Sequence, residues 1–131
     1  MNNSTKESII RLLYHYFSIA DFDNIKQLFH PQAVWEQMQG FPNGGTHKGA
    51  EAIIQNVFKG FKINWVEWKS INERFFETDD LVFAIGFYEG TYMPTGKRMR
   101  ADYIHMYELQ NGKIIHFKQY TDTNMIAAAM L

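Results

Sequence analysis

A histidine between two tyrosines is the residue pattern in this sequence best suited to proton chemistry. In the segment Tyr103-Ile104-His105-Met106-Tyr107, strand alternation would place all three polar rings on one face. An unperturbed histidine titrates near about pH 6.5, so His105 could accept or donate a proton near neutral pH. Asp102 falls on the opposite face unless a bulge intervenes, and it therefore ranks below His105 as a catalytic candidate.

A second alternating segment carries an amide on the same face. In Phe117-Lys118-Gln119-Tyr120-Thr121, alternation groups Phe117, Gln119 and Thr121 together. An amide can orient a ligand through hydrogen bonds, but it cannot accept a proton at neutral pH. Gln37 is a second amide of this kind. Its neighbour Glu36 alternates to the opposite face and is a reserve candidate for a base.

Composition excludes several classes of site. The sequence has no cysteine, and its five histidines show no metal-ligand spacing, so we predict no metal or other cofactor. A net charge of -1 supplies no field to attract nucleic acid. No apolar run approaches the roughly 20 residues of a membrane span, and the start lacks the pattern of a leader. We therefore expect a cytoplasmic protein with no nucleic-acid or membrane partner.

The first half of the chain is predicted to be mainly helical. Ser4 to Glu7 matches a capping box, and apolar residues follow it at three- and four-residue steps to about residue 20, which predicts one wide buried face that includes Leu12 and Tyr16. His30-Pro31 should end the second helix, because the residue before a proline is pushed out of helical conformation. The predicted helices span about residues 4–20, 21–30 and 49–61, with a short strand at 33–38 and an irregular loop at 40–45.

The second half changes to the composition of strands separated by turns. Asn111-Gly112 is the strongest hairpin signal, because both residues tolerate positive φ. The predicted strands cover residues 63–76, 81–93, 99–109 and 113–121, and the apolar tail 124–131 forms a terminal helix or a dimer contact. Early helices followed by late strands predict one α+β domain over residues 1–131 with a curved antiparallel sheet.

Four segments, taken in order, resemble one protein family. They are Tyr16-Phe17-Ser18-Ile19-Ala20-Asp21, Phe29-His30-Pro31-Gln32-Ala33-Val34-Trp35-Glu36, His47-Lys48-Gly49-Ala50-Glu51-Ala52-Ile53, and Asn111-Gly112-Lys113-Ile114-Ile115 leading into Tyr120-Thr121-Asp122-Thr123. The chain is similar over nearly its whole length to the nuclear transport factor 2-like superfamily, which includes SnoaL-like cyclases and ketosteroid isomerases. The resemblance implies a cone in which three N-terminal helices and a mixed-edge sheet enclose an apolar pocket. Such a fold does not fix an activity.

The resemblance also implies roles for individual residues. Tyr16 matches the phenolic oxyanion donor of the isomerases, and Gln37 stands where they carry a basic aspartate. His105 matches their second oxyanion donor if the last hairpin takes a one-residue gap, and without that gap the match falls on Ile104. Gln119 matches the acid/base aspartate of the cyclases. Because both carboxylates are replaced by amides, the substrates of those enzymes are not carried over.

Two functions remain open from the sequence. One is a domain that binds a small apolar or aromatic molecule, extending to a cofactor-free acid/base isomerase, cyclase or dehydratase of hydrophobic carbonyl compounds. The other is a non-catalytic dimerisation or assembly module, and a homodimer fits both. The catalytic candidates are His105, Tyr16 and Asp102, and the ligand-binding candidates are Phe29, Trp35, Gln37, Trp65, Tyr88, Tyr92, Tyr103, Tyr107, Phe117 and Gln119. Each aromatic candidate also fits a plain core position.

Overall fold

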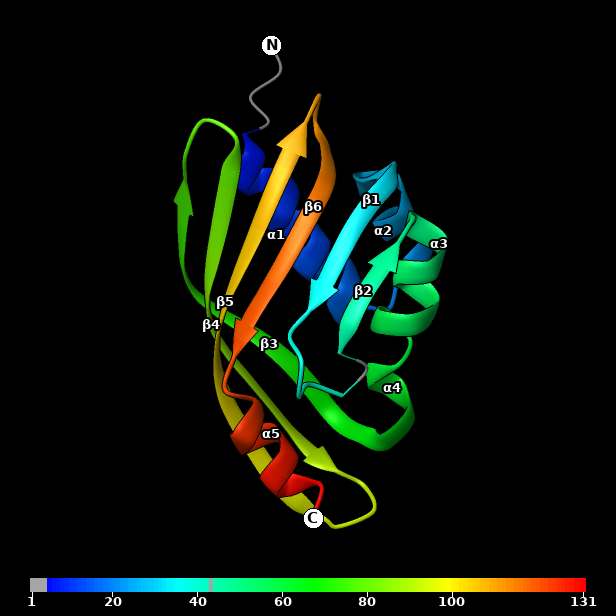
Figure 1. The fold of residues 1–131 in the computed structure, drawn as a ribbon, viewed down its shortest axis with the longest axis vertical. Helices are drawn as coiled ribbons and strands as arrows, with labels where there is room; N and C mark the ends of the chain where they lie inside the picture. Colours follow the sequence, from blue (N-terminus) through cyan, green and yellow to red (C-terminus); the bar gives the residue numbers. More distant parts are fainter. Residues whose placement is uncertain (1–4, 43) are drawn as a thin grey trace.

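A six-stranded mixed sheet with helices against its concave face forms an α+β cone (Figure 1). The computed structural model describes residues 5–42 and 44–131. The strands are β1 (Phe29–Gln37), β2 (Gly45–Lys48), β3 (Trp65–Glu77), β4 (Leu81–Tyr92), β5 (Lys97–Gln110) and β6 (Lys113–Thr121). The helices are α1 (Lys6–Ser18), α2 (Phe22–Leu28), α3 (Ala50–Ile53), the π-helical turn η1 (Ile54–Phe58), α4 (Phe61–Asn64) and α5 (Thr123–Ala129).

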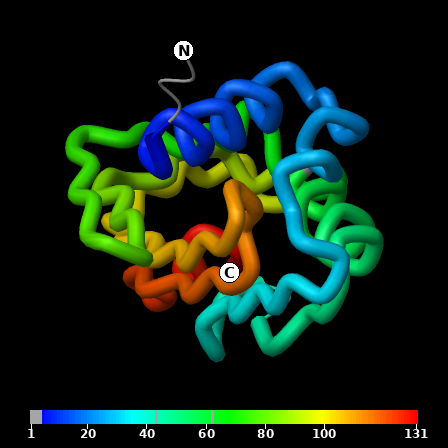
Figure 2. Tube along the Cα trace, turned by 90° about the horizontal axis from the view of Figure 1, so that it is seen from above, coloured from blue at the N-terminus to red at the C-terminus, as the bar shows by residue number. Residues whose placement is uncertain are grey.

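The strand order is β2-β1-β6-β5-β4-β3. The pairing of β1 with β6 is parallel, and the other neighbouring pairs are antiparallel. This arrangement confirms the predicted α+β cone with a mixed edge. Seen from above, the sheet bends around an interior that α1 covers on one side and the α3 to α4 segment covers on another (Figure 2). Residues far apart in the sequence therefore meet across this interior, as Tyr14 of α1 and His105 of β5 do.

Helix α1 is held in place by one narrow apolar face. Its buried residues are Ile10, Leu13 and Phe17, whereas Leu12 is 42% exposed. Thr5 caps the helix in a reciprocal capping box with Ser8. The box predicted at Ser4 to Glu7 begins at a residue outside the described ranges. The buried face of α1 is narrower than the predicted one. As a result, Tyr14 turns towards the interior and Tyr16 does not.

Several predicted boundaries around β1 were wrong. Helix α2 ends at Leu28, and Pro31 lies inside β1 rather than at a helix end. The strand accepts this proline because the β1 to β6 pairing is irregular between Phe29 and Val34, where its missing N–H disrupts no regular ladder. The end of the predicted loop also differs, because residues 45–48 pair with β1 as β2. The third predicted helix is broken into α3, η1 and α4.

Strand β3 follows β4 with two shifts of register. The first lies between Val66 and Lys69, and the second lies between Asn72 and Arg74. Near the second shift, a Cβ placed on Gly86 would meet the Ile71 carbonyl oxygen at 1.8 Å, so only glycine fits this approach. The two irregularities let β3 bend around the helices. By contrast, the predicted Asn111-Gly112 hairpin is confirmed, with both residues at positive φ.

The C-terminal segment forms α5, which packs against β5 at the narrow end of the cone (Figure 1). Asp122 caps this helix, and Ile126 and Ala129 are buried. The predicted terminal helix is thus confirmed, and part of the apolar tail is used within the chain. In the part of the chain that the structure describes, no helix is long and apolar enough to cross a membrane. The cytoplasmic location stays a prediction.

Candidate functional site

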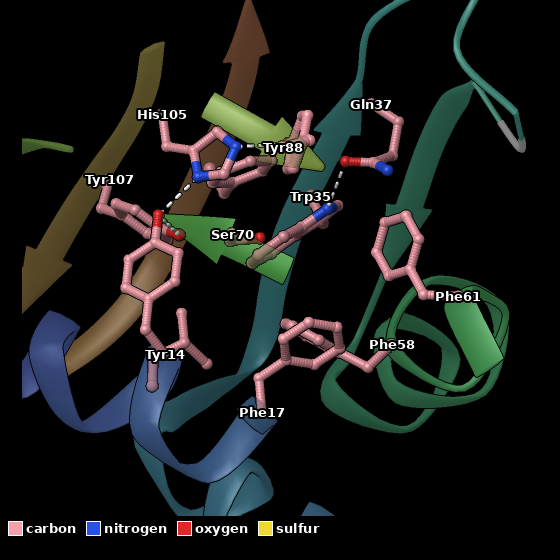
Figure 3. Close-up of a pocket in the computed structure, with 12 residues that line it drawn as sticks. Tyr14, Phe17, Trp35, Gln37, Phe58, Phe61, Ser70, Tyr88, His105 and Tyr107 are labelled. Atoms are coloured by element: carbon pink, nitrogen blue, oxygen red, sulfur yellow. Dashed lines mark hydrogen bonds between the residues drawn. The ribbon is translucent and has the colours of Figure 1, made fainter. Parts of the chain in front are cut away.

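A small aromatic cavity lies between α1, the concave face of the sheet and the α3 to α4 segment (Figure 3). Its volume is about 30 Å³, far below the roughly 300–1,000 Å³ of small-molecule sites. The interior is thus largely filled by the protein's own rings. The predicted site residues that line it are Trp35, Gln37, Tyr88, His105, Tyr107 and Phe117. Residues that the sequence analysis did not select include Tyr14, Phe58, Phe61 and Ser70.

His105 is the polar centre of the cavity and is only 4% exposed. Its Nδ1 atom is hydrogen-bonded to the Tyr14 hydroxyl from α1, and its Nε2 atom is hydrogen-bonded to the Tyr88 hydroxyl from β4 (Figure 3). The Tyr107 hydroxyl donates to the Tyr14 hydroxyl at 2.7 Å. The Gln119 amide nitrogen donates to the Tyr88 hydroxyl at 2.8 Å. One helix, α1, and three strands, β4, β5 and β6, are therefore joined by the network around one imidazole.

Every titratable group in this network is neutral near pH 7. Burial lowers the pKa of His105 to about 3, because the apolar surroundings disfavour the imidazolium. Burial likewise raises the pKa of Tyr14, Tyr88 and Tyr107 above the ordinary value for a phenol. The cavity therefore offers uncharged hydrogen bonds. Such fixed donors can stabilise negative charge that develops on a bound oxygen.

The hydrogen-bond network leaves one phenol hydrogen that the imidazole does not use. A neutral imidazole has one donor and one acceptor nitrogen, so His105 donates to one of its two phenols and accepts from the other. The Tyr14 hydroxyl accepts from Tyr107, and the Tyr88 hydroxyl accepts from Gln119, so each of them keeps its own hydrogen. The phenol that accepts from His105 therefore has its hydrogen available to an oxygen in the cavity.

Helix α1 turns Tyr14, rather than the expected Tyr16, towards the cavity. Tyr14 follows the buried Ile10 by four positions and precedes the buried Phe17 by three, so these residues share one helical face. Tyr16 is half-buried beside the ring of His15 and does not line the cavity. The spacing of Tyr14 from Ile10 and Phe17 could have pointed to it in the sequence. The predicted face was wider than the real one and included Tyr16, so Tyr14 was not selected.

The two carboxylate candidates lie on the outer face of the sheet. Asp102 is exposed, and the β4 to β5 register runs without a bulge beside it. Alternation therefore keeps Asp102 away from the cavity that His105 lines. Glu36 also points outward and is bonded to His116 at 2.5 Å. Among the described residues, no group of three or more His, Asp or Glu side chains is placed to hold a metal.

The two amides hold other groups in position. The Gln37 side-chain oxygen accepts from the Trp35 indole nitrogen at 2.9 Å, and Trp35 stacks on Phe117 with ring centroids 3.6 Å apart. Gln119 is 1% exposed and accepts from the Met38 backbone nitrogen at 3.0 Å while it donates to Tyr88. The amides thus complete a neutral network where a carboxylate would bring a charge.

The other predicted ligand-binding residues lie behind the cavity wall or away from it. Tyr103 stacks on His105 with ring centroids 3.9 Å apart, without lining the cavity. Phe29 belongs to the core, where its ring packs against Trp35. Trp65 and Tyr92 pack against each other with ring centroids 4.9 Å apart, outside the cavity lining.

A groove of about 410 Å³ lies beside the cavity, between α1 and β3. Tyr14, Phe17 and Ser70 line both the groove and the cavity, so these three side chains form the boundary between them. Trp68 lines the groove next to this boundary. Neither Ser70 nor Trp68 was selected from the sequence, because the irregular part of β3 breaks the alternation that would have pointed to them.

Comparison with known proteins places the chain among SnoaL-like proteins. The family model of the SnoaL-like domain matches residues 10–117. An NTF2-like protein from Burkholderia thailandensis is 32% identical, with a TM-score of 0.92 over 98% of each chain. TerC, in a structure co-crystallised with polyporic acid, is 22% identical, with a TM-score of 0.86 over 97% of this chain and 98% of that chain. Bal32a from a soil-derived mobile gene cassette is 22% identical, with a TM-score of 0.83 over 95% of each chain. The last two likenesses show the fold alone, and no curated protein matches the sequence.

The neutral state of His105 makes stability depend on pH. The folded chain resists protonation of His105 down to about pH 3, whereas the unfolded chain binds this proton below about pH 6.5. Stability from this residue is therefore complete above pH 6.5 and falls as the pH drops. Between about pH 7 and about pH 5, this residue should lower the free energy of unfolding by about 2 kcal/mol. We expect His105→Gln, which keeps one donor and one acceptor but does not titrate, to abolish this part of the pH dependence. Urea unfolding across this range measures it, and equal pH slopes for both proteins would contradict a neutral His105.

Proposed function

This chain belongs to the SnoaL-like domain family, and we propose that its cone binds a small apolar or aromatic molecule carrying a carbonyl or hydroxyl oxygen. The observation that carries the proposal is the uncharged hydrogen-bond network around His105 in a wall of aromatic rings. Aromatic walls favour apolar ligands through burial of surface, worth about 25 cal/mol per Å². The phenol hydrogen that His105 does not accept, from Tyr14 or from Tyr88, supplies a donor for one ligand oxygen.

The proposed ligand uses both the cavity and the adjoining groove. The cavity of about 30 Å³ is too small for such a ligand, whereas the groove of about 410 Å³ lies within the range of roughly 300–1,000 Å³ for ligand sites. The body of the ligand would lie in the groove, and its oxygen would replace water near His105. This mode requires movement of Tyr14 or Phe17, which separate the two spaces. A relative co-crystallised with polyporic acid supports ligand binding within this fold.

A neutral site favours a neutral ligand. Transfer of an isolated charge into apolar surroundings is unfavourable unless an opposite charge compensates it. His105, Tyr14 and Tyr88 supply hydrogen bonds and no compensating charge. A ketone or a protonated phenol therefore suits the cavity better than a carboxylate does.

Binding should depend on Tyr14 and not on Tyr16. We expect α-tetralone, a bicyclic aromatic ketone, to bind the protein and raise its melting temperature. Tyr14→Phe should weaken this binding roughly three- to tenfold, because it removes the hydroxyl that orders His105. Tyr16→Phe is the matched control on the same helix and should change affinity by less than about twofold. Isothermal titration calorimetry measures both effects, and equal losses in the two variants would place the site elsewhere.

A cofactor-free acid/base enzyme acting on hydrophobic carbonyl compounds is the second candidate function. It would use His105 for proton transfer and Tyr14 or Tyr88 to stabilise oxyanion charge. The contact of one imidazole with two phenols supports it. We favour binding because a pKa of about 3 makes His105 a weak base, and no carboxylate lines the described cavity.

Proton exchange separates the two candidates. An acid/base enzyme of carbonyl compounds would remove a proton from the carbon beside the ketone of α-tetralone. We expect exchange of this proton in heavy water to stay within about threefold of the buffer rate, because the available base is weak. Proton NMR follows the exchange. Faster exchange that disappears in His105→Gln would instead establish the catalytic candidate.

We also propose that the chain forms a homodimer through the outer face of its sheet. Ile104 and Tyr120 are paired across β5 and β6, and each is 41% exposed. They line a shallow groove of about 470 Å³ on this face. A second copy would cover this apolar pair.

The dimer proposal is tested by mass in solution. Light scattering at micromolar concentration should give twice the mass of one chain, and Ile104→Glu should shift the population towards the monomer because it would bury a charge. Arg98 is exposed on the same face of β5 but lies six residues before Ile104, so Arg98→Glu is the control for a general charge effect. A monomeric mass for the unmodified chain would refute the proposal.

A further inference from the structure

Trp68 combines full burial with a hydrogen-bond donor that has no partner. Its side chain is 6% exposed and lines the groove between α1 and β3. Among the described residues, its indole nitrogen is the buried side-chain polar atom without a hydrogen bond. An unsatisfied buried donor is unfavourable, and native structures leave few of them. This donor therefore needs an acceptor from outside the described chain.

A bulge in β3 turns Trp68 inward. The pairing with β4 shifts register between Val66 and Lys69, and Glu67 has a φ of 57°. Positive φ is uncommon for residues other than glycine, and such strained positions cluster at ligand sites. Two exposed residues thus separate the buried Trp65 and Trp68, where regular alternation would leave one. Backbone strain and an unpartnered donor therefore occur at neighbouring positions.

The surroundings of Trp68 are aromatic. Its ring stacks on Phe61 with centroids 4.6 Å apart and lies near Phe41 and Tyr88, with centroids 5.9 Å and 4.9 Å away. Of these neighbours, Tyr88 has an oxygen, and that oxygen already contacts His105 and Gln119. Tyr88 therefore lies between the His105 network in the cavity and the ring of Trp68, whose indole nitrogen is buried beside the groove.

On the basis of the proposed function, we propose that Trp68 is a specificity-determining residue that donates its indole hydrogen to a second oxygen of the ligand, after the side chains that cover the buried nitrogen have moved aside. The ligand class is then a flat apolar molecule with two separate oxygen functions, one directed to the His105 network and one to Trp68. A molecule with a single oxygen would leave the indole without a partner. Discrimination follows from the unsatisfied donor rather than from shape.

The test compares two ligands that differ in one oxygen. The probes are α-tetralone substituted on its aromatic ring, opposite the ketone, with either a methoxy group or an ethyl group of similar shape. We expect the unmodified protein to bind the methoxy probe roughly three- to tenfold more tightly than the ethyl probe. In Trp68→Phe, which keeps an aromatic ring and removes the donor, the two affinities should agree within about twofold.

The outcomes separate this inference from the proposed function. If neither probe binds the unmodified protein, the proposed function and this inference both fail. If both bind and the methoxy preference is the same in Trp68→Phe, Trp68 has no such role while the binding function stands. If the unmodified protein shows no preference, the indole bonds to water instead, and the inference is overturned.

Indole NMR provides a second measurement if Trp68→Phe does not fold. The chain has 3 tryptophans, and their indole N–H signals can be assigned through bonds in the unmodified protein. The methoxy probe should shift the Trp68 signal downfield relative to the ethyl probe, because it adds a hydrogen bond. Equal Trp68 shifts with the two probes would overturn the inference.

Discussion

Burial of His105 among tyrosine hydroxyls is the constraint on which the interior of this protein depends. An imidazole that is removed from water must have both nitrogens satisfied, and the partners come from α1 and β4. Tyr107 on β5 and Gln119 on β6 extend the same network. The position of α1 is therefore fixed by polar contacts as well as by its apolar face. A shift of the helix would separate Tyr14 from His105 and leave polar atoms unsatisfied.

Two amides, Gln37 and Gln119, keep this network and the adjoining wall uncharged. Gln119 donates a hydrogen bond to Tyr88 and accepts one from the backbone of Met38. An ionised carboxylate has no hydrogen to donate, so it could not make the bond to Tyr88 in the same way. Gln37 accepts from the indole of Trp35. Each amide is thus fitted to its neighbours. The site therefore offers a fixed set of uncharged donors and acceptors, and no carboxylate lines the described cavity.

Regular patterns in the sequence predicted the parts of the fold that are regular. Alternation along β5 correctly placed His105 inside and Asp102 outside, and the helix and strand order predicted the cone. Tyr14 was missed because apolar residues on the exposed side of α1 widened its apparent face. Trp68 was missed because a bulge depends on the pairing of two strands and has no period of its own. The size of the cavity depends on the way in which aromatic rings from distant parts of the chain pack against one another. No local sequence pattern predicts that packing.

The parallel seam between β1 and β6 has a consequence for the order of folding. Across it, Glu36 and His116 are 80 residues apart in sequence, whereas β4, β5 and β6 follow one another through short turns. Contacts of long sequence separation carry a greater loop-closure entropy and slow the formation of a fold. The hairpins can therefore assemble before the seam closes, so Trp35 and Gln37 would complete the aromatic wall late. Pulse-labelled amide exchange would detect this order as slower protection of β1 than of β5.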